Sequence, residues 1–196
     1  KRICQNCKKE FSIEDRDFDF YEKIGVPPPT FCYLCRAQRR FVFRNERFLY
    51  RRKSDFSGKE IFTMFPPEAS IKVYENSAWY GDSWDPLDYG QEVDFSRPFL
   101  EQFKELLEAV PHMALSVSDG TMVNSDYSNN ASYLKNCYLV FNADNNEDCM
   151  YSDAIYYSKD CIDMLSVTKS ELVYESFWVD HSSRVFFSSE IENSLD

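Results

Sequence analysis

Four cysteines in two close pairs place the strongest constraint on how this chain can fold. Cys4 and Cys7 form one Cys-x-x-Cys pair, Cys32 and Cys35 form the other, and 24 residues separate the pairs. Two such pairs supply the four thiolates of a tetrahedral zinc site, each pair from one tight turn. Disulfides or a redox motif are the alternatives, but a redox motif needs only one pair. The spacing therefore predicts one structural zinc ion with no open, catalytic position.

The residues around the two pairs predict a compact finger. Ser12 and Asp15 resemble a capping box, which predicts a short helix over residues 13–24 that ends at Gly25. Three consecutive prolines then hold the chain extended, and the second cysteine pair opens another helix over residues 35–51. A knuckle followed by a pair at a helix start is typical of treble-clef and zinc-ribbon fingers.

Basic residues are concentrated on the second of these helices. Residues 1–53 contain 14 lysines and arginines and 7 acids, a net charge of +7, whereas the other 143 residues carry −18. Arginines interleaved with aromatic residues suit phosphate contacts and base stacking in RNA or DNA. The alternative is that these cations pair with the acidic remainder of the same chain or of another copy. The candidate nucleic-acid-binding residues are Arg36, Arg39, Arg40, Arg44, Arg47, Arg51, Arg52 and Lys53.

The composition excludes several other classes of protein. Aromatic residues make up 17% of the 196 residues and only 5 are glycines, as in a packed globular protein rather than a disordered acidic one. No run of about 18 apolar residues occurs, so we expect no membrane-spanning helix. No phosphate loop or serine nucleophile elbow is present, and His112 and His181 belong to no recognisable catalytic or metal motif. Zinc-bound and lone thiols favour a reducing, cytoplasmic location.

Residues 54–121 predict an aromatic-rich connector that contains one helix. The aromatic residues between Trp79 and Tyr89 surround several aspartates, which favours a loop-rich core over a sugar site. An apolar stripe after Ser96 predicts a helix with Ser96 as its cap. We expect Phe95 to pack against Leu100 as a hydrophobic staple, and the helix to cover one end of the repeat region.

From about Met122 the sequence is periodic at 12 residues, with the spacing falling nearer to 11 after residue 171. Short strand-like runs separated by Asn, Asp and Ser predict a β-solenoid with one strand and one turn in each repeat. We expect the three lone thiols to stack as small buried groups, on one side or on alternating sides, with a disulfide between neighbouring repeats as the alternative. We expect a column of polar residues at turns, where the side chains can bond their own backbone. These structural ladders comprise Cys137, Cys149 and Cys161, and Asn136, Asp148 and Asp160.

The expected fold is therefore an α+β chain of three parts. Residues 1–53 form the zinc finger with its basic helix, residues 54–121 the connector with its helix, and residues 122–196 the β-solenoid.

Several strings of residues together resemble one known family. They are FYEKIGVPPP at 20–29, CYLCRAQRR at 32–40, RNER at 44–47, WDPLDYG at 84–90, DFSRPF at 94–99 and NCYLVF at 136–141. They are similar to an uncharacterised family of zinc-ribbon proteins with Cys-rich repeats, abundant in bacteria of the candidate phyla radiation. The resemblance spans essentially the whole chain and implies no established activity.

The same resemblance implies two differences from the family. Its members tend to hold further cysteine pairs where this chain has Ser54 with Ser57 and Glu75 with Ala78, which implies the loss of a second zinc site. They also tend to continue into a longer repeat tail. A solenoid that stops at Asp196 without a cap predicts self-association through that end.

These features favour a zinc-stabilised, non-enzymatic binding protein that contacts RNA or DNA through its basic helix. One alternative is a structural or assembly protein whose basic head docks on the acidic solenoid of a neighbour. Another is an acidic rod that mimics nucleic acid. The last is a β-helix enzyme that cleaves carbohydrates with paired carboxylates. Its candidate acids and bases are Asp148, Asp153, Asp160 and Asp163.

Overall fold

The computed structural model describes residues 1–42 and 45–195, and the chain divides into two compact units, residues 1–45 and 46–196. Unit 1 holds an antiparallel hairpin and two helices: β1 (Arg2–Ile3), β2 (Glu10–Phe11), α1 (Asp15–Lys23) and α2 (Tyr33–Phe41). Unit 2 begins before the expected boundary at residue 53. The reason is that strand β3 (Tyr50–Lys53) pairs with strand β4 (Glu60–Thr63) of the same unit.

The first helix is shorter at its start than the sequence predicts. Its capping box is formed by Glu14 and Asp17, not by Ser12 and Asp15, so the helix begins at Asp15. At its other end the chain leaves the helix at Gly25, whose φ of +67° favours glycine.

The predicted basic helix over residues 35–51 is wrong in its second half. Helix α2 ends at Phe41 with Val42 as its C-cap. Residues 50–53 are extended instead, because they form ladder hydrogen bonds with β4, whose register pairs Tyr50 with Thr63.

The connector part of unit 2 is built from short elements. Two aromatic rings, Tyr74 and Trp84, lie 5.7 Å apart edge to face, and Trp84 also contacts Trp79 and Tyr89. The rings therefore form a loop-rich core. The elements are β5 (Val73–Tyr74), which runs parallel to β6 (His112–Met113), the helices α3 (Asn76–Trp79) and α4 (Phe99–Ala109), and the 3₁₀ helix η1 (Pro86–Tyr89).

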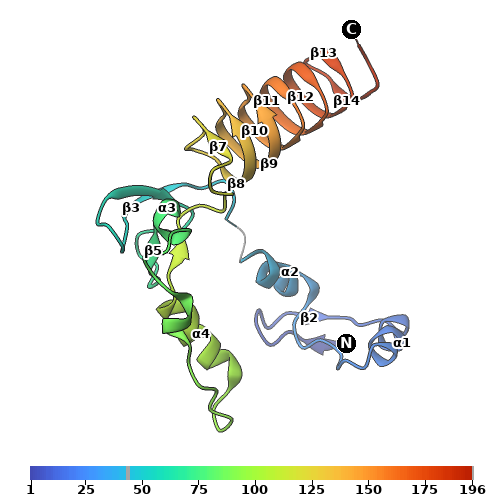
Figure 1. Ribbon diagram of the computed structural model, residues 1–196. Coiled ribbons are helices and arrows are strands. Elements are labelled where there is room, and N and C mark those ends of the chain that lie inside the picture. Colours follow the sequence, from blue (N-terminus) through green and yellow to red (C-terminus); the bar gives the residue numbers. More distant parts are fainter. Residues whose placement is uncertain (43–44, 196) are drawn as a thin grey trace. The chain divides into compact units, whose positions relative to one another are not determined.

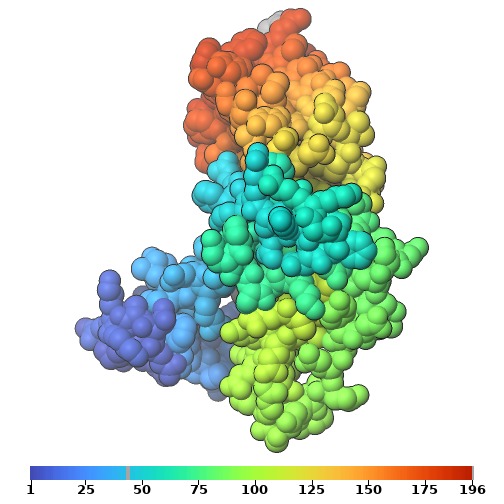
Figure 2. Space-filling model, turned by 90° about the vertical axis from the view of Figure 1, so that its left-hand side faces the viewer, coloured from blue at the N-terminus to red at the C-terminus, as the bar shows by residue number. Residues whose placement is uncertain are grey.

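Helix α4 does not begin or pack as the sequence predicts. The Ser96 hydroxyl donates to Asp94 at 2.6 Å, and the helix starts at Phe99 with Pro98 at its N-cap. No residue of α4, all of which the structure describes, is buried. The expected staple is also absent, since Phe95 and Leu100 are 96% and 75% exposed. The segment projects from unit 2, green to yellow-green in Figure 2.

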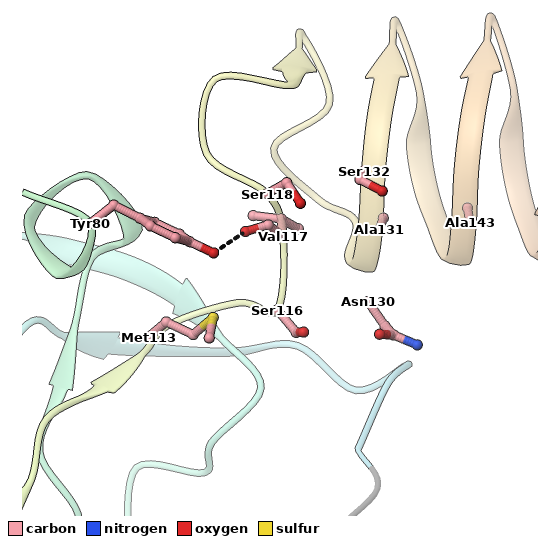
Figure 3. Close-up of a pocket in the computed structure, with 9 residues that line it drawn as sticks. All are labelled: Tyr80, Met113, Ser116, Val117, Ser118, Asn130, Ala131, Ser132 and Ala143. Carbon is pink, nitrogen blue, oxygen red and sulfur yellow. Dashed lines mark hydrogen bonds between the residues drawn. The ribbon is translucent and has the colours of Figure 1, made fainter.

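The first coil of the solenoid is joined to the connector by residues 112–118 rather than by α4. Val117 bridges to Ala131 in parallel, and the Tyr80 hydroxyl donates to the Val117 carbonyl at 3.1 Å (Figure 3). Small side chains around this bond leave a pocket of about 220 Å³. The expectation that α4 caps the repeats is therefore wrong.

The solenoid is a stack of parallel strands along one axis of unit 2, from β7 at its left-hand end to β13 and β14 at its right-hand end in Figure 1. Each paired residue lies 12 positions from its partner: Cys161 pairs with Val173, and Phe177 pairs with Ser189. The period of 12 thus continues after residue 171, and the expected shift toward 11 is wrong. The strands are β7 (Met122–Val123), β8 (Asn129–Lys135), β9 (Tyr138–Glu147), β10 (Met150–Tyr156), β11 (Lys159–Thr168), β12 (Glu171–Asp180), β13 (Ser183–Phe186) and β14 (Ser189–Glu192).

Each coil has four corners rather than one turn. From Asn130 to Asn193 every third residue has a positive φ, between 43° and 60°. The residue after each corner points inward and the other two lie on the outside, where Phe141 and Asp153 are covered and most others are exposed to solvent. A 12-residue coil therefore has four sides of three residues. Left-handed backbone costs energy for most residues, and the parallel ladder between coils offsets this cost.

The four inward columns differ in chemistry. One contains Cys137, Cys149 and Cys161, all at most 2% exposed, and another contains aliphatic residues such as Val167. A third is a serine ladder. In it the Ser170 hydroxyl accepts from the Ser182 N–H at 3.1 Å and donates to the Thr168 carbonyl at 2.8 Å. These bonds satisfy polar groups that would otherwise be costly to bury.

Candidate functional site

The four cysteines predicted to bind a metal come together in unit 1. Cys4 and Cys7 lie on the knuckle between β1 and β2, Cys32 is the N-cap of α2, and Cys35 lies in its first turn. All four Sγ atoms lie within 4.8 Å of one another. Two backbone hydrogen bonds close the knuckle. The Cys4 N–H donates to the carbonyl of Lys9 at 2.9 Å, and the Lys8 N–H donates to the carbonyl of Cys4 at 3.0 Å.

The geometry of this cluster fits one tetrahedral ion. The Sγ atoms of Cys7 and Cys32 are 3.8 Å apart, and four ligands at the usual zinc–sulfur distance of about 2.3 Å are separated by about 3.8 Å in a tetrahedron. The Cys32 N–H points to the sulfur of Cys4 at 3.3 Å, and Asn6 Nδ2 to the sulfur of Cys35 at 3.4 Å. Such donors orient and stabilise thiolate ligands. The four-cysteine group can hold one metal ion.

The thiols of the cluster differ in acidity. Burial raises the pKa of Cys4, but hydrogen bonds from the backbone of Cys32, Cys7 and Asn6 outweigh it and lower the pKa to about 6. The hydrogen bond from Asn6 lowers the pKa of Cys35. Burial and the three neighbouring thiols together outweigh that bond and raise the pKa to about 11. The metal-free cluster therefore keeps some protons, and a bound ion would release them.

Three of the predicted arginines line one groove of unit 1. Arg36, Arg39 and Arg40 of α2 form one wall, and residues 27–31 form the other, around a volume of about 860 Å³. We call this the arginine groove. The guanidinium of Arg39 lies over the ring of Phe31, 5.5 Å from its centre. None of the three arginines forms an ion pair with a carboxylate in the part of the chain that the structure describes.

The other predicted basic residues do not belong to this groove. Arg44 lies outside the described residues. Arg47, Arg51, Arg52 and Lys53 belong to unit 2, the last three on strand β3. Their assignment to the face of one helix together with the first three is therefore wrong, because α2 ends before them.

Three of these four cations have acidic partners in unit 2. Arg47 Nε lies 2.6 Å from Asp153, Arg51 lies 3.6 Å from Glu60, and Arg52 lies 3.1 Å from Asp55. For these residues the structure shows the pairing within one chain that the sequence left as an alternative to nucleic acid.

The aspartates considered for catalysis occupy structural positions on the solenoid. Asp153 is 7% exposed and also accepts from Asn142 Nδ2 at 2.9 Å, besides its ion pair. Asp148 and Asp160 sit at corners, with φ of 54° and 53°, and Asp163 sits at another, with φ of 59°. Asp148 accepts a bond from Asn136 Nδ2, one coil earlier, at 3.0 Å.

The buried thiol column carries protons rather than charge at its first two positions. The hydrogen bond with Cys149 and then burial raise the pKa of Cys137. The bond from Cys137 lowers the pKa of Cys149, but its bond to Cys161 and burial raise it more, to about 12.

A second knuckle with the same backbone geometry lies between β3 and β4, at the positions where the family resemblance implies a lost zinc site. The N–H of Ser54 donates to the carbonyl of Lys59 at 2.8 Å, and Gly58 N–H donates to the carbonyl of Ser54 at 3.0 Å, the same two bonds that close the first knuckle. Glu75 is the N-cap of α3, as Cys32 is of α2. We call residues 2–41 the cysteine finger and residues 50–79 the serine finger.

In the serine finger a hydrogen-bonded cluster occupies the place of the thiols. Ser54 is 3% exposed, its hydroxyl donates to the carboxylate of Glu75, and it accepts from the Phe56 N–H at 3.1 Å. Burial raises the pKa of Glu75, but bonds from Ser54 and Ser57 outweigh it and hold the pKa below its ordinary value. The fourth position, Ala78, is buried and apolar. The signal for this finger in the sequence is the spacing of Ser54 with Ser57 and of Glu75 with Ala78, which repeats that of the two cysteine pairs.

Comparison with known proteins adds no further evidence about this site. A scan of protein-family models, a search of curated proteins and a search of solved structures each returned no match. Among the described residues, none of the helices has the length and apolar character needed to cross a membrane. The four-cysteine cluster and the solenoid are therefore the features on which a functional argument can stand.

Proposed function

We propose that unit 1 is a finger built on one structural zinc ion and that it binds nucleic acid through the arginine groove. One observation carries this proposal. Three guanidinium groups line a single groove without a carboxylate partner among the described residues. Guanidinium groups that are not paired within their own unit suit the oxygens of phosphate groups, which they can contact in a bidentate manner.

Zinc is the proposed ion because four thiolates in tetrahedral geometry form one of its usual structural sites. The protein fills all four positions, so the ion's role is to hold the β1–β2 knuckle against the start of α2. Residues 27–31 lead directly into Cys32, and Arg36 follows Cys35. The ion therefore fixes both walls of the groove relative to each other.

The character of the groove favours contacts with the nucleic-acid backbone. Its wall of prolines at 27–29 is preorganised, and little conformational entropy is lost when a ligand binds it. Arg39 rests on Phe31 and keeps its guanidinium plane in place. Contacts to phosphates carry no sequence information by themselves, so we propose binding with little sequence preference.

Fluorescence anisotropy with labelled single-stranded RNA and DNA of mixed sequence tests the proposal. We expect affinity to fall as salt rises, with a log–log slope of about −2 to −3 for three phosphate contacts. The double substitution Arg39→Ala/Arg40→Ala should weaken binding about tenfold or more. The matched control Arg16→Ala/Lys23→Ala removes the same charge from α1 and should bind nearly as well as the unsubstituted chain.

Two outcomes would contradict the proposal. One is the absence of binding at low salt, and the other is an equal loss of affinity in both double variants. Elemental analysis of the purified chain tests the metal separately, and we expect one zinc per chain.

A further inference from the structure

An apolar arm of unit 2 carries several of the most exposed apolar side chains among the described residues. It comprises residues 87–103, which project from the unit in Figure 2. The side chains of Phe95, Leu87 and Leu100 are 96%, 83% and 75% exposed, and Phe99 is 65% exposed. Monomeric soluble proteins rarely leave large apolar patches uncovered, and those that remain mark interaction sites.

The arm is held in place by its own hydrogen bonds. The Asp94 carboxylate accepts a hydrogen bond from the N–H of Ser96 at 2.9 Å. The Gln102 side chain accepts from the Asp94 N–H at 2.8 Å and donates to the Asp94 carbonyl at 2.9 Å. Phe95 lies between these bonded residues. Its ring is therefore presented to solvent by an ordered loop, and the entropy cost of docking it is small.

Acidic residues surround the apolar side chains of the arm. Residues 82–108 contain eight acids and two cations, and both cations, Arg97 and Lys104, are already paired with Glu105 and Glu108 on α4. The surface that complements the arm must therefore combine an apolar floor with a basic rim.

The arginine groove has this combination. Its prolines and Phe31 supply apolar surface, Arg36, Arg39 and Arg40 supply the rim, and its volume of about 860 Å³ can accept an aromatic side chain. Residues 1–45 carry 10 lysines and arginines against 6 acids, the opposite sign to the arm. Because every chain carries both surfaces, each copy in solution meets a complementary partner.

We propose that the apolar arm of one chain docks in the arginine groove of a second copy, with Phe95 as its anchor. The two surfaces differ, so the contact is heterologous and leaves one arm and one groove free for further copies. Assembly would also compete with nucleic acid for the groove, a consequence that rests on the proposed function. The contact itself does not depend on nucleic acid.

Complementation between two full-length variants tests this contact. Phe95→Ser removes the anchor, and Arg39→Glu/Arg40→Glu reverses the rim of the groove. In sedimentation velocity we expect the mass of the unsubstituted chain to rise with concentration and each variant alone to stay at the monomer mass. An equal mixture should form a 1:1 dimer, because the first variant keeps an intact groove and the second keeps an intact arm.

Controls separate a lost contact from a lost fold. Phe187→Ser removes an aromatic side chain on the solenoid that is 72% exposed, and it should assemble like the unsubstituted chain. Phe95 is almost fully exposed, so its removal should leave circular dichroism and zinc content unchanged. A monomer mass for the unsubstituted chain at all concentrations, assembly that survives both variants, or a mixture that stays monomeric would each overturn the inference.

The same proteins distinguish this inference from the proposed function. If complementation occurs but no protein binds RNA or DNA, the contact stands and the function fails. If the mass never changes while Phe95→Ser binds nucleic acid as the unsubstituted chain does, the function stands and the contact fails.

Discussion

The cysteine finger and the serine finger share a backbone but differ in what stabilises it. Both fingers close a knuckle with the same pair of backbone hydrogen bonds. Each also has the first residue of its second pair, Cys32 or Glu75, at a helix N-cap. Among the described residues of unit 1 only Cys4 and Cys35 are buried, so that unit has almost no apolar core. The serine finger instead packs Thr63 and Val73, both fully buried, beside its hydrogen-bonded cluster.

This difference shows when a knuckle needs a metal. An ion supplies folding free energy where too little apolar surface is buried. In the serine finger a neighbouring core supplies that free energy, and a partly buried hydrogen bond between Ser54 and Glu75 connects the knuckle to the helix.

Removal of the metal should unfold the cysteine finger and leave the serine finger intact. Structural zinc sites contribute about 10 kcal/mol or more in isolated fingers, and in the described part of unit 1 no side chain other than Cys4 and Cys35 is buried to replace that contribution. Hydrogen–deuterium exchange after chelation should show loss of protection at residues 2–11 and unchanged protection at residues 50–63. Equal loss in both knuckles would show that the serine finger also depends on a metal.

Four cysteines placed in the serine finger should create a second zinc site. The substitutions are Ser54→Cys, Ser57→Cys, Glu75→Cys and Ala78→Cys, at positions whose backbone matches the first site. We expect two zinc ions per chain by elemental analysis, and a gain in thermal stability only when zinc is present. A control variant that keeps Ser54 and Ala78 should bind only the one zinc ion of the cysteine finger. One zinc ion per chain in the full variant would show that the two backbones are not equivalent.

Ser54→Ala should destabilise unit 2 by about 2 kcal/mol, because it removes one of the two side-chain donors to the partly buried Glu75 carboxylate. Denaturation at saturating zinc, followed by the fluorescence of Trp79 and Trp84, measures this loss. The control Ser77→Ala lies on the exposed side of α3 and should change stability by less than about 0.5 kcal/mol. Similar effects of the two substitutions would argue against the importance of the Ser54–Glu75 bond.

Acid should weaken the serine finger through Glu75. Its pKa is lowered in the folded chain, mainly because bonds from Ser54 and Ser57 outweigh burial. The resulting stability is present above the unfolded pKa of about 4.3 and is lost as pH falls through the folded value. Stability measured across this range should fall less in Glu75→Gln than in the unsubstituted chain. Parallel curves would assign the acid sensitivity to other carboxylates.

The sequence predicts some features of this protein because they depend on spacing alone. Cys-x-x-Cys pairs bring thiols together whenever the two segments fold side by side, and a 12-residue period puts Cys137, Cys149 and Cys161 one coil apart. The corners are harder to foresee, since residues as unlike as Asn136, Leu139 and Trp178 all take a positive φ. The sign of the corners in the sequence is the recurrence of small or aliphatic residues at every third position.

The arginine groove shows the opposite case. Nothing in the local sequence shows that the arginines of residues 36–53 are divided between a helix and a strand. Helix propensity alone predicts one helix through all of them. Helix α2 ends at Phe41, and β3 is extended, because residues 50–53 pair with a strand ten residues later. Long-range pairing overrides local preference whenever a ladder of hydrogen bonds outweighs helix propensity.

By itself the sequence determined the four-cysteine cluster and the coiled repeat, because ligand spacing and period are properties of the chain. Only the tertiary structure decided which arginines remain unpaired among the described residues, where the apolar arm projects, and that Ser54 and Glu75 form a hydrogen bond where the resemblance implies a lost zinc site. Those features depend on which distant residues become neighbours, and that is set by the free energy of packing the whole unit.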